Sequence, residues 1–75
     1  MRWWLSFAKP GESLGVCVVD ADTFMGAVIK THRMGINPGG EVVGAPVEGV
    51  SDEHTNLLLK PEIARVIVEH VRAIE

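Results

Sequence analysis

Two apolar runs on either side of a short polar turn constrain the fold of this chain more than any other feature. The runs Arg2–Ala8 and Leu14–Asp20 are rich in aromatic and β-branched residues, and the polar segment between them contains a Pro-Gly pair. This pattern is typical of a β-hairpin, whose two strands run antiparallel. The chain is therefore expected to build its core on an antiparallel sheet.

Alternation along each run assigns side chains to the two faces of that sheet. Trp3, Leu5 and Phe7 share the face that is expected to point into the core, which leaves Trp4 on the opposite face. The second run is apolar on both faces, as in strands that are covered on both sides. Cys17 lies in this run and is expected to be an ordinary buried residue rather than a reactive thiol.

Two further segments have the apolar spacing of helices. The first is predicted from about Asp22 to Met34, with Asp22 or Thr23 as the N-cap and Gly35 as the terminator. The second is predicted from Pro61 to the C-terminus. Its apolar stripe consists of Ile63, Val66, Ile67, Val71 and Ile74.

Between the two helices the signals are weaker. Glu41–Val43 are predicted to form a third strand, which Gly44 and Pro46 keep short, and Pro46–Leu59 are predicted to be a loop with a short turn of helix at most. The chain is thus expected to be a single α+β domain in the order ββαβα. It should have a small antiparallel sheet with two helices on one face.

The shortness of the chain points to self-association. With 75 residues, only about 60% of the surface of the unfolded chain can be buried, and one cysteine cannot form an internal disulfide. The hydrophobic fraction of 47% would leave apolar surface exposed on a monomer. A homo-oligomer is therefore expected.

Charge and hydropathy exclude several classes of partner. The net charge is −3 and lysines and arginines are not clustered, which argues against nucleic acid as a partner. No segment has the length of a membrane span or the pattern of a secretory signal, so a cytoplasmic protein with no membrane partner is expected.

The densest local information lies in the turn Asn37-Pro38-Gly39-Gly40. Glycines can bring backbone N–H groups close to an anion, and three basic side chains precede the turn. It matches neither a P-loop nor a dinucleotide fingerprint, so a purely structural turn is the alternative. The candidate ligand-binding residues here are Lys30, His32, Arg33, Asn37, Gly39 and Gly40.

Trp4 completes the candidate site, because its side chain must find a partner away from the core face. It is expected either to stack on a ligand ring or to lie in a subunit interface. His32, His54 and His70 lack the spacing of a zinc site, so no metal is predicted. No nucleophile, base and acid form a recognisable set, so neither an enzyme nor a cofactor is expected.

The segment RWWLSFAKPGESLGVCVVDAD (residues 2–22) and the later GINPGGEVVG (residues 35–44) resemble a family of small bacteriophage and prophage proteins with an NPGGEV motif. At the position of Ile36 that family often has a small residue or cysteine, a difference that affects packing. The resemblance implies a protein that acts by binding inside an infected bacterial host. Some such phage proteins sequester the cyclic or ADP-ribose-derived nucleotides that signal in bacterial defence.

Two functions follow from these features. In the first, a homo-oligomer sequesters a signalling nucleotide, with phosphate at the NPGG turn and Trp4 stacked on the base. In the second, the chain inhibits a host enzyme by covering its surface, Trp4 is an anchor and there is no small-molecule ligand. A thermal-shift panel of nucleotides separates the two, because only a ligand-binding protein is stabilised.

Overall fold

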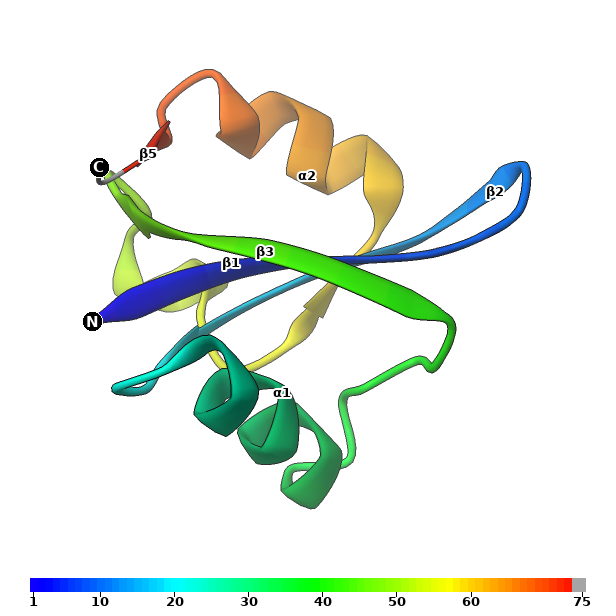
Figure 1. Cartoon of the computed structure of the whole chain (residues 1–75). Helices are drawn as coiled ribbons and strands as arrows, with labels where there is room; N and C mark the ends of the chain where they lie inside the picture. Colours follow the sequence, from blue (N-terminus) through cyan, green and yellow to red (C-terminus); the bar gives the residue numbers. More distant parts are fainter. Residues whose placement is uncertain (74–75) are drawn as a thin grey trace.

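The computed structural model describes residues 1–73, which form a five-stranded antiparallel sheet, two α-helices and one turn of 3-10 helix (Figure 1). The strand order is β4-β2-β1-β3-β5. The predicted α+β class is confirmed. In chain order the elements are β1 (Arg2–Lys9), β2 (Glu12–Asp20), α1 (Phe24–Arg33), β3 (Glu41–Glu48), η1 (Asp52–His54), β4 (Leu58–Leu59), α2 (Pro61–Val68) and β5 (Arg72–Ala73).

The predicted hairpin is confirmed as β1 and β2, the two best-covered strands of the sheet. Leu5 pairs with Cys17 at its middle, and the register shifts after Phe7, where Leu14 becomes an extra residue in β2. The turn between the strands contains Gly11 with a φ of 76°, a conformation that glycine adopts without strain.

The two helices cover opposite faces of the sheet, whereas the sequence pattern predicted both on one face (Figure 1). Cys17 and Val19 of β2 pack on the α1 side, and Val16 and Val18 of the same strand pack on the α2 side. The physical reason is the apolar character of β2 on both faces, which a single layer of helices would leave half exposed to water.

The first helix is two residues shorter at its start and one shorter at its end than predicted. The Thr23 side chain accepts a hydrogen bond from the Gly26 N–H at 3.0 Å, so Thr23 rather than Asp22 is the N-cap. At the other end Gly35 has a φ of 72° and its N–H donates to the His32 carbonyl, as expected of a glycine terminator.

The second helix ends at Val68 and does not continue to the C-terminus as predicted. A turn through His70 then brings the chain back as β5, whose residues 72–73 pair with Val47 and Glu48 of β3. Gly49 makes this return possible, because its φ is 93° and a Cβ there would overlap the carbonyl oxygen of His70. The predicted stripe residue Ile74 lies outside the described residues.

The segment predicted as a loop is more ordered than expected. β3 runs through Pro46 to Glu48, with Pro46 opposite Trp3, and η1 and β4 follow. Proline is compatible with a strand at the edge of a sheet, because there its missing N–H faces away from the neighbouring strand. The short turn of helix in this segment is confirmed as η1.

Candidate functional site

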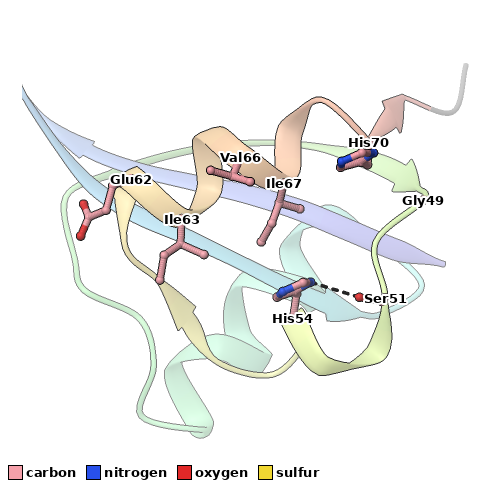
Figure 2. Close-up of a pocket in the computed structure, with 8 residues that line it drawn as sticks. All are labelled: Gly49, Ser51, His54, Glu62, Ile63, Val66, Ile67 and His70. Atoms are coloured by element: carbon pink, nitrogen blue, oxygen red, sulfur yellow. Dashed lines mark hydrogen bonds between the residues drawn. The ribbon is translucent and has the colours of Figure 1, made fainter.

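An apolar pocket of about 460 Å³ lies between α2 and the segment that joins β3 to η1 (Figure 2). This volume is within the range of small-molecule sites, about 300–1,000 Å³, which typically combine apolar walls with a few polar groups. The residues that line it are Gly49, Ser51, His54, Glu62, Ile63, Val66, Ile67 and His70.

The floor of the pocket comes from the predicted apolar stripe of α2. Ala64 and Ile67 are buried against the sheet, but Ile63 and Val66 remain 45% and 67% exposed. The outer half of the stripe, Ile63 and Val66, lies outside the hydrophobic cluster that packs on the sheet and lines the pocket. Figure 2 shows Ile63 and Ile67 projecting toward His54.

Arg2 fixes the opposite wall of the pocket. Its guanidinium donates to the Val50 carbonyl at 2.8 Å and to the Asp52 carboxylate at 2.9 Å, which attaches the start of η1 to β1. Two more hydrogen bonds join Arg2 to the Asp20 carboxylate, at 3.2 and 3.3 Å, and this pairing lowers the pKa of the Asp20 carboxyl group. The network holds the wall through charge-assisted hydrogen bonds at the surface.

A short chain of hydrogen bonds orients the ring of His54. The Ser51 hydroxyl donates to the Glu53 carboxylate at 3.4 Å, and a carboxylate can only accept. The same hydroxyl lies 3.1 Å from His54 Nδ1, in a contact whose donor depends on the tautomer of the ring. The contact holds the imidazole in place, and a neutral imidazole offers one donor and one acceptor nitrogen.

The contact between Ser51 and His54 differs from a hydrolytic triad. In a triad the base takes the proton of the hydroxyl and the acid orients the imidazole, whereas here the acid contacts the serine. The three residues are sequence neighbours around η1, and their hydrogen bonds order the local backbone and the imidazole ring.

The basic residues predicted to bind an anion are spread around the end of α1. Lys30 donates to the Asp20 carbonyl at 2.9 Å, on the side of the helix that faces the end of β2. His32 and Arg33 are exposed in the last turn of the helix. The structure therefore directs Lys30 to a backbone partner and leaves the other two in solvent.

The NPGG turn has a structural explanation. Asn37 donates to the Thr31 hydroxyl at 3.2 Å and accepts from the Gly39 N–H at 2.8 Å, so the turn is attached to a buried residue of α1. Gly39 and Gly40 have φ values of 85° and 76°, which confirms the prediction of positive φ at the turn. The Gly39 N–H, which was a candidate anion donor, already has an intramolecular partner.

Trp4 lies on the α2 face, away from α1 and the basic residues around its end. It is partly buried against the hydrophobic cluster of Val16, Val18 and Ala64. It also lines a shallow second hollow of about 260 Å³ together with Arg65. The predicted site therefore divides into two parts on opposite faces of one protomer.

Cys17 is fully buried, as predicted. Its thiol contacts the Ile36 carbonyl at 3.5 Å, and burial raises its pKa to about 11. The reactive thiolate is therefore suppressed at neutral pH.

The sequence analysis missed the pocket because its residues come from three segments that were interpreted separately. His54 and His70 were considered only as metal ligands, and Ile63 and Val66 only as core.

Residues 1–73 contain no group of three or more His, Cys, Asp or Glu side chains arranged to hold a metal ion. Nor does this part of the chain include a helix long and apolar enough to span a membrane.

Comparison of the chain with protein-family models, curated proteins and solved structures finds no match in any of the three.

Proposed function

We propose that the chain is a non-enzymatic binding protein that holds a compact heterocyclic ring, of the nucleobase type, in the pocket beside α2. The observation that carries the proposal is the combination of an apolar floor with one oriented imidazole, that of His54. Nucleobases present flat apolar faces and both hydrogen-bond donors and acceptors at their edges, so they match both parts of this surface.

The charge of the pocket favours the base over the phosphate of a nucleotide. Glu62 is the one acidic residue among those that line the pocket. An anionic phosphate close to this carboxylate would be repelled, while a ring on the floor would displace water from apolar surface. In the proposed complex the base enters the pocket and any phosphate faces solvent.

This proposal keeps the role that the resemblance to phage proteins implies, the sequestering of a signalling nucleotide, but changes the contacts. The base contacts α2 and η1, and the basic residues at the end of α1 have no part in the same pocket. Binding without chemistry is sufficient for such a role, because a sequestering protein lowers the free concentration of its ligand by mass action.

Isothermal titration calorimetry with paired nucleosides and nucleotides tests the proposal. The panel contains adenosine, guanosine, cytidine and uridine, their monophosphates, cyclic dinucleotides and ADP-ribose. At least one nucleoside is expected to bind, and no more weakly than its phosphorylated form. A panel without any binding member, or binding only of phosphorylated members, contradicts the proposal.

Two variants locate the site. Val66→Asp places a charge on the pocket floor and is expected to weaken binding at least tenfold, whereas Val43→Asp alters a valine of nearly equal exposure on β3, 69% against 67%, and leaves affinity unchanged. His54→Phe keeps a ring but removes the ring nitrogens, and is expected to weaken binding of ligands that form a hydrogen bond with the imidazole. Unchanged affinity in Val66→Asp excludes this pocket.

The second candidate function, inhibition of a host enzyme by surface contact, is favoured by one observation. Ile63 and Val66 form an exposed apolar pair one turn apart on α2, 45% and 67% exposed. A partner protein that covers this pair would bury apolar surface without a small ligand. The nucleoside panel separates the two functions, because a protein-binding surface predicts no heat with any of its members.

A further inference from the structure

Among the described residues, the outer edge of β3 is open over most of its length. On one side β1 pairs with residues 41–46, whereas on the other side the described part of β5 pairs with Val47 and Glu48. None of the turn and loop backbone hydrogen bonds of the described chain involves residues 42–45. The backbone groups on this edge are therefore available to another strand.

Pro46 identifies which backbone groups face outward. It pairs with Trp3 and has no N–H, so this pair cannot be of the type that exchanges two hydrogen bonds across an antiparallel ladder. Pair types alternate along the ladder, so Val42 and Gly44 belong to the same type as Pro46. The N–H and C=O groups of Val42 and Gly44 consequently point away from β1.

The edge lacks the features that usually prevent strands from pairing. Residues 42–45 read Val-Val-Gly-Ala, without a charged side chain or a proline, and Val43 is 69% exposed. The open stretch is bounded by the glycine turn before Glu41 and by β5 beside Val47. A partner strand must therefore be about as short as the stretch itself.

We propose that this edge pairs with the same edge of a second copy, antiparallel about a two-fold axis at Val43, so that the two sheets become one. Val43 then lies opposite its own counterpart, and Val42 lies opposite the counterpart of Gly44. By symmetry the pair of Val42 with Gly44 occurs twice. In each pair the outward N–H and C=O groups of the two residues face each other and can form two hydrogen bonds, which gives about four across the axis. The strand is thus complementary to itself, as a two-fold interface requires.

Charge and proline select this register. Glu41 falls opposite the counterpart of Ala45, and the two Glu41 residues are separated by about 14 Å along the strands, at about 3.4 Å per residue. A register centred on Gly44 would instead place Val42 opposite the counterpart of Pro46, where one hydrogen bond is lost. The pairing at Val43 keeps every outward group of Val42 and Gly44 matched.

The interface is small, so the dimer is weak. Five residues from each copy bury less than the roughly 800 Å² per partner of a standard interface. A dissociation constant in the micromolar range or weaker is therefore expected, with the dimer growing as concentration rises.

Sedimentation velocity over low micromolar to millimolar concentrations tests the proposal. The wild-type protein is expected to approach the mass of a dimer, and Val43→Asp to remain a monomer, because two carboxylates would then face each other at the axis. Val66→Asp is the matched control and should dimerise normally. A wild-type protein that stays monomeric, or a Val43→Asp protein that dimerises like wild type, overturns the proposal.

Disulfide trapping tests the register even if the aspartate variant folds poorly. Val43→Cys is expected to form a disulfide-linked dimer under mild oxidation, because facing residues at the axis are close enough for a disulfide. Glu41→Cys and Val66→Cys are the controls and should cross-link far more slowly, while Cys17 is buried and does not interfere. Equal cross-linking rates in the three variants overturn the register.

Discussion

The two glycines of the NPGG turn provide a matched pair that separates backbone strain from close packing. Both have positive φ, 85° at Gly39 and 76° at Gly40. A Cβ on Gly39 would have no heavy atom within 4 Å, whereas a Cβ on Gly40 would lie 2.6 Å from the Ala8 carbonyl oxygen and 2.9 Å from Leu14. Alanine at either position adds the same strain, but only at Gly40 does it add overlap.

The expected costs differ accordingly. Gly39→Ala should lower the free energy of unfolding by about 1 kcal/mol through the positive φ alone. Gly40→Ala should lose the same amount and about 1–3 kcal/mol more, because the Ala8 carbonyl is backbone of β1 and cannot move aside without disturbing the sheet. In a chain of this size each kcal/mol lowers the melting temperature by about 4–8 °C.

Urea unfolding followed by circular dichroism measures both costs. Gly11→Ala serves as a second control for strain, since Gly11 has a φ of 76° and open space around its Cβ position. The reasoning fails if Gly40→Ala is no more destabilising than Gly39→Ala and Gly11→Ala. In that case the turn at Gly40 can shift, and the close approach to β1 has no part in stability.

Three further predictions concern the core, the surface network and the thiol. Ile67→Ala is expected to lower the free energy of unfolding by about 2–4 kcal/mol, and Ile63→Ala by less than about 1 kcal/mol, because the two side chains are 7% and 45% exposed; urea titrations give both values. The pKa of Asp20 is lowered by its hydrogen bond to Arg2, so its contribution to stability is present above the ordinary carboxyl value of 3.8 and is lost as the pH falls below it; melting temperatures between pH 2 and pH 6 should show a smaller decrease in Arg2→Met than in wild type. Burial raises the pKa of Cys17 to about 11, so a thiol reagent at pH 8 should label the native protein far more slowly than the protein in denaturant, and equal rates would contradict the packed position of β2.

The local elements of the fold were predictable because their signals are local. The Pro-Gly turn between two apolar runs predicted β1 and β2 and assigned Leu5 and Phe7 to one face correctly. Thr23 and Gly35 marked the ends of α1 within two residues. These features depend on backbone preferences and periodicity, which a sequence displays directly.

The layers of the fold required information about contacts distant in sequence. Apolar residues on both faces of β2 favoured cover on both sides, yet both helices were predicted on one face, because the sequence does not display which elements pack against which face. The end of α2 at Val68 depends on Gly49, which allows β5 to return beside β3. No residue within α2 itself signals that the helix stops there, because Glu69 and His70 are compatible with a helix.

The candidate site was the least predictable feature for the same reason. Lys30, His32 and Arg33 are close in sequence, but the structure gives Lys30 a backbone partner and attaches Asn37 to Thr31. The pocket instead depends on Arg2, which joins β1 to η1 across about fifty residues of chain. A site formed by such a distant contact leaves no continuous motif.

Two of the surfaces that expose apolar side chains are assigned an occupant by the proposals. One is the outer half of the α2 stripe, with Ile63 and Val66, and the other is the open edge of β3 around Val43. The surfaces differ in the geometry they offer, because a concave pocket accommodates a ring while a flat strand edge accommodates another strand. If self-association covered α2 instead, Val66→Asp would abolish the dimer and Val43→Asp would preserve it, so the same two variants assign each surface to its occupant.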